Sequence, residues 1–360
     1  MQEDEIHFGV FTHPILPQDL SNFDFLKYYK DHLNLVREAE KLGYEHFFFA
    51  EHHFSRLGGN PSEGVLLSAA CQHTVKIRIG SLAYVIPVRN PLHLAEELAL
   101  LDNLCEGRLD VGLTGGISEL ELKELGLDPK IAKVMSREAT SALLGFMKIT
   151  AEGKRFTFKG DYYKFEDVER LIPYVQKPHP PIWIPTRTIP TTIWAAQNGL
   201  NLVTGIDRDE ILKERIDAYR NNYSGIGNPR LAIEKYIFTS NNEEKVNKLL
   251  PSMLKELKGA FLDLQERKNI KSYEIGEVRK GEGFVPPEFY KYDDVNFMTT
   301  TARVLVGKPK EVATKVKKSL EITKANTFLI HIDWITISYE DNVENLELFA
   351  NEIIPEIKRR

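Results

Sequence analysis

The sequence has few cysteines and no long apolar run. Its 360 residues include only Cys71 and Cys105, and neither belongs to a CxxC pair. Two cysteines make no disulfide scaffold, so a reducing environment fits best. No window approaches the roughly 18 consecutive apolar residues that a membrane span needs. The opening MQEDEIHFGV is acidic where a signal peptide is basic and then apolar. We therefore expect a cytoplasmic protein without a membrane partner.

An excess of positive charge is also missing. The chain has 47 Lys and Arg against 52 Asp and Glu, a net charge of −5, and the signs alternate along the polar stretches. Proteins that bind nucleic acids through their phosphates usually carry a basic excess or stripe. No nucleic-acid partner is expected. The content of 42% hydrophobic and 28% charged residues is instead typical of a folded globular protein.

Short apolar or aromatic runs alternate along the chain with segments of helical period. The runs predicted to be strands are 6–11, 46–50, 77–86, 108–113, 181–185, 201–205, 231–239 and 326–332. The segments predicted to be helices are 25–42, 63–73, 91–104, 137–151, 190–198, 209–223, 243–257 and 309–323. Apolar strands joined by helices indicate a parallel sheet that is covered on both faces.

Eight such units predict an α/β fold, a closed (β/α)8 TIM barrel that occupies residues 1–360 as a single domain. A doubly wound open sheet is the alternative. That fold would favour a GxGxxG motif after the first strand, where this chain has Thr12, His13 and Pro14.

Two insertions interrupt the predicted barrel. Residues 155–168 alternate like a strand and turn at Lys159, Gly160 and Asp161, which predicts a surface hairpin before the fifth strand. Residues 259–301 show no clear period, and so long a stretch inside a compact domain is usually a lid or a disordered segment. We predict a lid at this position, before the last βα unit.

Titratable residues follow the second predicted strand in the segment EHHF, Glu51 to Phe54. Sites in TIM barrels form just past the carboxyl ends of the strands. Neighbouring residues on an extended chain point to opposite sides, so only one of His52 and His53 can face the barrel mouth. General acid–base catalysis is the favoured role. Bonding of both rings to loop carbonyls is the structural alternative. Metal binding has little support, because no HExxH or Cys/His cluster is present.

Two further strand ends carry candidate ligand-binding residues. Thr114, Gly115 and Gly116 end the fourth strand, where glycines allow either a close backbone approach to a ligand or a turn. Thr186, Arg187 and Thr188 end the fifth strand, and Thr191 lies in the helix that follows. Hydroxyls and a guanidinium at a helix N-terminus favour a phosphate. The alternative is helix capping with a surface ion pair.

Several segments together resemble the bacterial luciferase-like flavin-dependent monooxygenases, and the first of them most resemble the luciferase α subunit. The match as a whole extends over about three quarters of the chain. The segments that carry it are FGVF near the start, Gly43 to Phe54, Ile79 to Leu113, Pro181 to Leu200 and Val306 to Val316. The resemblance implies a TIM barrel that binds reduced FMN, which a separate flavin reductase supplies. With O2, the enzyme would oxygenate a small organic substrate through a flavin C4a-hydroperoxide. A homodimer formed by early helices such as 91–104 is also implied.

The resemblance also assigns residues. The family's catalytic histidine falls on His52, preceded by Glu51 and followed by the second histidine, His53. A non-prolyl cis peptide bond under the flavin falls between Leu82 and Ala83.

The remaining assignments concern the cofactor. Luciferase's reactive cysteine and its phosphate-binding arginine fall on Thr114 and Gly115, and an acidic flavin-site residue falls on Glu121. The other phosphate contacts fall on Arg187, Thr188 and Thr191, and Arg187 replaces a glutamate. One cation is thus lost at Gly115 and one is gained at Arg187. No metal is implied.

Two other functions fit the same resemblance. A branch of the superfamily transfers hydride with the deazaflavin F420. A non-catalytic flavin-binding protein or supporting subunit would keep the fold without the acid–base residue, which the presence of His52 disfavours.

Overall fold

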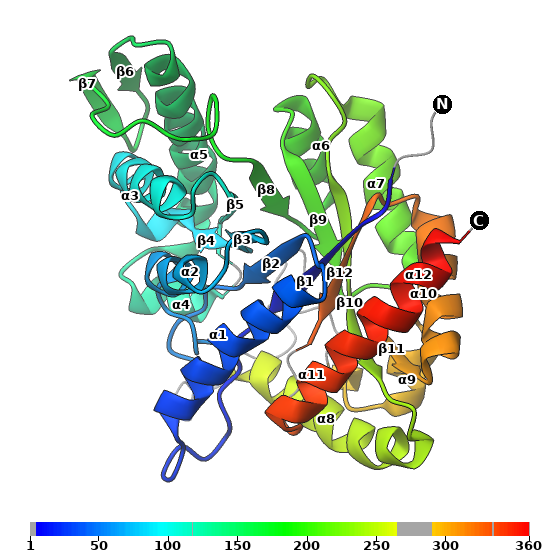
Figure 1. Cartoon of the computed structure of the whole chain (residues 1–360). Helices are drawn as coiled ribbons and strands as arrows, with labels where there is room; N and C mark the ends of the chain where they lie inside the picture. The colour runs from blue at the N-terminus through cyan, green and yellow to red at the C-terminus, as the bar shows by residue number, and fades with distance from the viewer. Residues whose placement is uncertain (1–4, 117, 265–289, 333–334, 360) are drawn as a thin grey trace.

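Eight parallel strands close into a barrel in the computed structural model, which describes residues 5–116, 118–264, 290–332 and 335–359. The strands are β1 (His7–Thr12), β2 (His46–Phe49), β3 (Arg78–Ser81), β5 (Leu109–Thr114), β8 (Ile182–Pro185), β9 (Asn201–Gly205), β10 (Leu231–Thr239) and β12 (Thr327–His331). Each pairs in parallel with the next, and β12 pairs with β1 to complete the ring (Figure 1). The predicted TIM barrel is confirmed.

Helices connect the strands and cover the outside of the ring. They include α1 (Phe25–Lys41), α2 (Glu63–Gln72), α3 (Pro91–Leu104), α5 (Pro129–Ala151), α6 (Ile189–Gln197), α7 (Asp209–Asn222), α8 (Glu243–Asp263) and α10 (Pro309–Thr323). In α1, residues at the two ends determine where the helix begins and ends. The Asp24 side chain accepts the Lys27 N–H at its start, and Gly43 adopts a φ of +82° just after its end.

The third predicted strand is broken in two. β3 ends at Ser81 and β4 (Tyr84–Val85) resumes beside β5, with a cis peptide bond between Leu82 and Ala83. The bond is where the resemblance predicts it. Gly112 of β5 leaves room for this arrangement, because a Cβ atom there would collide with the Ser81 carbonyl oxygen.

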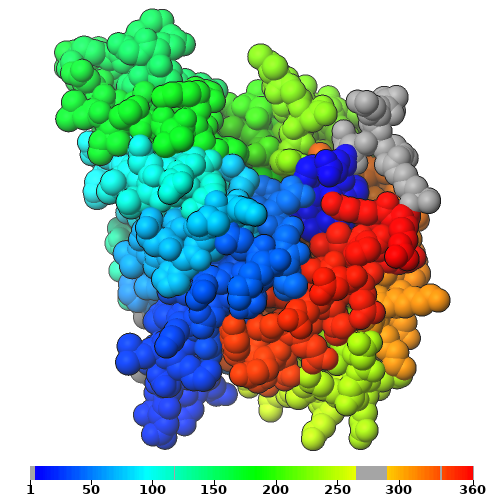
Figure 2. Space-filling model, viewed as in Figure 1, coloured from blue at the N-terminus to red at the C-terminus, as the bar shows by residue number. Residues whose placement is uncertain are grey.

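The predicted hairpin is present. β6 (Phe156–Lys159) and β7 (Lys164–Val168) pair antiparallel as a separate small sheet. With α5 they form a lobe that projects from the end of the molecule opposite α8 (Figures 1 and 2). Since α8 follows the carboxyl end of β10, the hairpin lies away from the end where a TIM barrel builds its site.

The long insertion is partly regular structure, so the prediction of an aperiodic segment over 259–301 is wrong at both ends. α8 continues to Asp263, and α9 (Val295–Thr300) forms before β11 (Val304–Gly307), a short strand that pairs with β10 and was not predicted. The rest of the predicted lid, residues 265–289, lies outside the described residues. The predicted helix 137–151 was also too short at its N-terminal end, because α5 begins at Pro129, directly after its N-cap residue Asp128.

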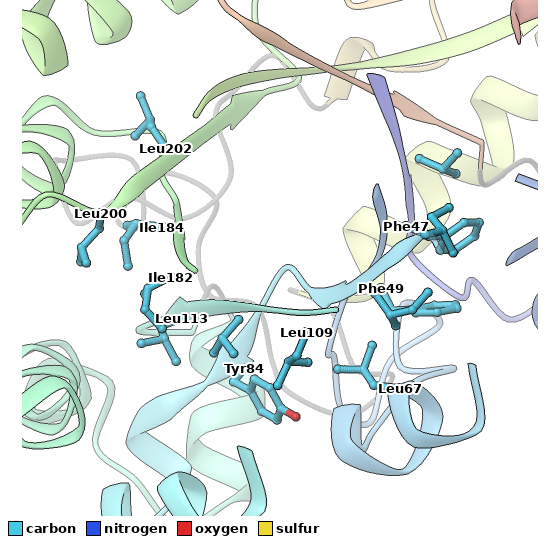
Figure 3. Packing of buried hydrophobic residues seen from close by; sticks show 14 of the residues in the cluster. Phe47, Phe49, Leu67, Tyr84, Leu109, Leu113, Ile182, Ile184, Leu200 and Leu202 are labelled. Carbon is cyan, nitrogen blue, oxygen red and sulfur yellow. The ribbon is translucent and has the colours of Figure 1, made fainter. Parts of the chain in front are cut away.

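Apolar side chains form two layers, one outside the ring of strands and one inside it. Outward-facing side chains of the strands pack against side chains of the helices, and Figure 3 labels members of this layer from both, such as Phe47 and Leu109 of the strands and Leu67 of α2. The inner layer contains Phe11, Phe48, Ala50, Leu82, Trp183, Val203, Ala232 and Leu329. This alternation along each strand fixes which side chains can reach the barrel mouth.

The cysteines differ from the expectation of a reducing environment. Cys71 at the end of α2 and Cys105 just after α3 are joined by a disulfide bond, with their Cα atoms 5.1 Å apart. The bond ties two neighbouring helices of the outer layer. Within the described ranges, no helix is long and apolar enough to cross a bilayer.

Candidate active site

The candidate residues gather where the carboxyl ends of the strands meet. His52 lies in the loop after β2, where its backbone N–H donates to the Asn60 carbonyl oxygen at 3.3 Å. Its Nδ1 donates to Oε1 of Glu121 at 3.1 Å, and both side chains are buried. The structure thus brings together two predicted site residues that are 69 positions apart. We call His52 and Glu121 the inner pair.

The position of Glu121 is set by a short helix, α4 (Glu119–Glu124). Ser118 caps this helix by accepting the Glu121 N–H at 3.1 Å, and its own hydroxyl donates to the Leu264 carbonyl oxygen at 3.0 Å. The Glu121 carboxylate also accepts the His53 backbone N–H at 3.0 Å. One carboxylate therefore orients both the His52 ring and the loop that carries it.

The other two predicted catalytic residues form a different group. His53 Nε2 donates to Glu51 Oε1 at 2.9 Å, and Arg89 Nη2 donates to Glu51 Oε2 at 2.9 Å. Arg89 also lies over the ring of Tyr84, which belongs to the outer core layer. We call Glu51, His53 and Arg89 the outer cluster. Among the described residues, neither the Glu51 side chain nor the His53 ring hydrogen-bonds to the side chains of the inner pair, and only the His53 backbone does.

The predicted cofactor residues on β5 lie beside α5. Thr114 pairs with Val85 across β4 and β5, so it adjoins the segment that contains Leu82 and Ala83. Gly115 lies so close to α5 that a Cβ atom there would stand 3.0 Å from the Ser136 hydroxyl. A side chain at position 115 would therefore crowd Ser136.

A second group of predicted residues lies at the start of α6. Arg187 Nη2 donates to Asp207 Oδ1 at 3.0 Å, and the Thr188 hydroxyl donates to the Thr191 hydroxyl at 3.0 Å. Thr188 is the N-cap of α6, yet its side chain makes no capping hydrogen bond to the helix amides. A guanidinium, two hydroxyls and these amides form a donor set that suits a phosphate.

Buried charges behind Arg187 were not predicted. Asp207, just after β9, lies 2.8 Å from Arg215 and 3.8 Å from Arg303, in addition to its contact with Arg187. Nearby, Lys235 of β10 contacts Asp209 at 2.8 Å, and burial lowers the pKa of Lys235 although Asp209 opposes the shift. Asp207 thus lies among three arginines that come from different parts of the chain.

Two histidines beside the inner pair were also missed. The His13 ring stacks on the His52 ring with centroids 5.4 Å apart, and on the His331 ring at 4.8 Å. Burial, followed by the charges of His331 and His52, holds the pKa of His13 well below its usual value. His13 follows the end of β1 and His331 ends β12, so the strand-end rule used for His52 would have found both. The described residues contain no group of three side chains arranged to hold a metal.

A family model described as luciferase-like monooxygenase matches residues 6–325. The uncharacterized protein y4wF of Sinorhizobium fredii is 32% identical over 60% of this chain and 60% of its own length. The oxygenase component of the flavin-dependent trigonelline monooxygenase of Acinetobacter baylyi is 23% identical, covering 97% of this chain and 95% of that protein.

Solved structures share the fold at low identity. Monooxygenase RslO1 from Streptomyces bottropensis superposes with a TM-score of 0.82 at 20% identity, over 97% of this chain and 99% of that one. The oxygenating constituent of 3,6-diketocamphane monooxygenase from Pseudomonas putida, in complex with FMN, gives 0.75 at 18% identity, over 98% of each chain. The F420-dependent tetrahydromethanopterin reductase of Methanopyrus kandleri gives 0.70 at 18% identity, over 98% of this chain and 100% of that one.

Proposed function

Because the chain belongs to the luciferase-like monooxygenase family, we propose that it uses reduced FMN and O2 to oxygenate a small organic substrate. The observation that carries the proposal is the pairing of His52 with Glu121 at the same end of the barrel as the phosphate-type donor set around Arg187. An acid–base group and an anion site at one barrel mouth are what a flavin monophosphate and a proton transfer together require.

The donor set at α6 would hold the FMN phosphate. Arg187, Thr188 and Thr191 would supply the side-chain donors, and the α6 amides, which the Thr188 side chain does not cap, would add to them. Leu82, Ala83, Thr114 and Gly115 would contact the rest of the cofactor from the neighbouring strand ends. Reduced FMN, when bound, supplies the two electrons for the reduction of O2.

His52 would move protons in this reaction. Its Nδ1–H donates to the Glu121 carboxylate, so Nε2 is the nitrogen that accepts a proton. Only 5% of His52 is exposed, which limits the access of water to this nitrogen. Glu51 and the His53 ring would act on catalysis only through the position of the loop.

The proposal includes two partners. The trigonelline enzyme is named as an oxygenase component, which supports a separate flavin reductase as the source of reduced FMN. A homodimer through early helices is supported by exposed apolar side chains on α2 and α3, namely Val65, Leu100 and Leu104.

F420-dependent hydride transfer is the second candidate, because F420-dependent enzymes share the fold. A non-catalytic flavin-binding or supporting subunit is the third, and the buried His52–Glu121 pair disfavours it. Calorimetric titration with FMN, reduced FMN and F420 separates the cofactors. A screen of long-chain aldehydes and small heterocycles for substrate-stimulated consumption of reduced FMN then separates an oxygenase from a binding protein.

The anion site has its own test. Replacing Arg187→Gln removes a charge-assisted contact worth about 1.5–3 kcal/mol, which should weaken FMN binding by roughly 10- to 100-fold. Riboflavin, which lacks the phosphate, should bind both proteins equally. R155A, in the hairpin at the other end of the barrel, is the control and should leave both affinities unchanged. Equal losses for FMN and riboflavin in R187Q would contradict the assignment.

A further inference from the structure

The helix α8 contacts both of the segments that carry the inner pair. Its buried residues belong to an apolar cluster that also contains Ile15, from the segment after β1, and Leu57, from the loop that carries His52. Leu57 has no exposed surface. The loop after β2 therefore shares a buried core with α8 on the side of the barrel where the candidate site lies.

Arg56 connects this loop to α8 by its charge. Its Nη2 donates to the Glu256 carboxylate of α8, and its Nε donates to the Leu16 carbonyl oxygen at 3.0 Å. The guanidinium passes over Gly259, where a Cβ atom would lie 2.8 Å from Nη1. Glu256 and Gly259 lie on the same face of α8, since residues three apart are neighbours on a helix surface. Only 13% of the Arg56 side chain is exposed, so solvent screens this ion pair less than a surface pair.

Backbone hydrogen bonds link Arg56 to His52. The His52 N–H donates to the Asn60 carbonyl oxygen at 3.3 Å, which closes the loop at its base. The Leu16 N–H donates to the Arg56 carbonyl oxygen at 2.7 Å, which fixes the middle of the loop to the segment after β1. Because the loop is closed in this way, a displacement of Arg56 also displaces His52.

Ser118 makes the second connection, from α8 to Glu121. Leu264 is the C-cap of α8, and the Ser118 hydroxyl donates to its carbonyl oxygen at 3.0 Å. The same hydroxyl accepts the Glu121 N–H at 3.1 Å as the N-cap of α4. Ser118 has no exposed surface, and a buried carbonyl at a helix end needs such a donor. One hydroxyl therefore joins the end of α8 to the start of the helix that carries Glu121.

We propose that the C-terminal end of α8 positions the inner pair. The ion pair of Arg56 with Glu256 fixes the loop of the histidine, and the Ser118 hydroxyl fixes the helix of the carboxylate. Both partners of the 3.1 Å hydrogen bond are then held by one rigid element. A misplacement of about 1 Å can lower the rate by about 100-fold, so this support affects catalysis although these three residues act only through the pair. Their effect on turnover rests on the proposed function, whereas their effect on the hydrogen bond does not.

The hydrogen bond is tested without any flavin. In ¹H–¹⁵N spectra of the full chain with labelled histidines, the Nδ1 proton of His52 is identified as the signal that H52A lacks. Glu256→Ala and Ser118→Ala should each raise the exchange rate of this proton with water by about 10-fold, because each variant releases one partner of the bond. E256Q keeps an acceptor for Arg56 and should show a smaller change, which also provides the test if E256A does not fold.

Two further variants make the test specific. K258Q is the matched control, because it breaks another ion pair of the same helix, with Asp293, and should leave the His52 signal unchanged. S118D separates the two roles of Ser118. An aspartate accepts the Glu121 N–H as an N-cap, but an ionised carboxylate has no proton for the Leu264 carbonyl oxygen. S118D should therefore exchange as fast as S118A.

A kinetic arm tests whether these residues act through the inner pair. With FMN and a substrate found by the screen above, E256A and S118A should each lower kcat about 10-fold while the affinity for FMN is retained. In an H52A background, the same two changes should leave the residual kcat unchanged, because the ring that they position is missing. A merely structural role would lower the residual kcat as well.

Each outcome bears on a separate part of the inference. An exchange rate of the His52 proton that neither E256A nor S118A changes overturns the inference, even if FMN binds. Slow exchange in S118D overturns the part assigned to the Leu264 carbonyl. Equal losses of kcat with and without His52 overturn the route through the inner pair. Failure of FMN to bind, with the expected exchange rates, instead overturns the proposed function.

Discussion

Two carboxylate–imidazole pairs lie back to back at the end of β2. In the inner pair, His52 meets Glu121 at 3.1 Å, and in the outer cluster, His53 meets Glu51 at 2.9 Å. The pairs differ in their other neighbours. Arg89 completes the outer cluster and balances its charge, whereas the His13 ring completes the inner one. We therefore infer different roles for the two pairs, because Arg89 neutralises the Glu51 carboxylate, whereas Glu121 is placed to stabilise a protonated His52.

The cause is the geometry of an extended chain. Glu51, His52 and His53 are consecutive, and successive side chains point to opposite sides, so His52 turns inward while its neighbours turn outward. The outer cluster then lies against the core between the barrel and its helices, where Arg89 covers Tyr84. We infer that the inner pair is built for chemistry and the outer cluster for holding the loop.

The largest expected effect tests this division directly. Replacing His52→Ala removes the proton-transferring ring, so reduced-FMN-dependent product formation should fall by about 10²- to 10⁴-fold. H53A is the matched control, since it removes the same ring one position later. H53A should lower the Tm, and its loss of kcat should be much smaller than that of H52A. Equal losses of kcat in the two variants, with both proteins folded, would contradict the assignment of chemistry to the inner pair alone.

The sequence predicts the barrel well because each strand and helix is marked by a pattern within its own residues. Each apolar run with a following helix can be identified without knowing its neighbours, and Gly43 marks the end of α1 by its own conformation. β11 was missed because it is only four residues long and continues an insertion that shows no period. The end of α8 was missed for the same reason.

The site is predicted less completely because it depends on which strands meet. That only one of His52 and His53 faces inward follows from alternation alone. The resemblance assigned Glu121 to the flavin site but did not pair it with His52. The contact between His13 and His331 requires the closure of β12 against β1, about 320 residues apart in sequence. The arginines around Asp207 come from two connecting segments and from α7, so no spacing in the sequence predicts that they meet.

A second prediction concerns the stability of the outer cluster. Replacing Arg89→Ala leaves the buried Glu51 carboxylate without its guanidinium, and removal of one partner of a buried ion pair costs about 3 kcal/mol. The free energy of unfolding measured in urea should fall by that amount. R89K keeps the charge and should recover part of the loss. A normal unfolding curve for R89A combined with loss of FMN turnover would instead place Arg89 in the chemistry.

The smallest expected effect comes from Glu63, a fully buried carboxyl at the start of α2 that accepts a hydrogen bond from Asn60 at 2.9 Å. Burial, followed by the charge of Glu51 in the outer cluster, raises the pKa of Glu63 well above its usual value. The folded protein therefore keeps this proton at a pH where the unfolded chain has released it. This difference lowers stability as the pH rises above the unfolded pKa.

Glu63→Gln removes that dependence, because the amide has no proton to lose. The Tm of E63Q minus that of the unmodified protein should therefore be larger at pH 8 than at pH 5, by about 2 °C. Glu347→Gln, on the exposed face of α11 (Tyr339–Leu348), is the control and should change Tm equally at both values. A difference that shrinks as the pH rises would mean that Glu63 is ionised and paired in the folded state. The outer cluster would then need a second counter-charge besides Arg89.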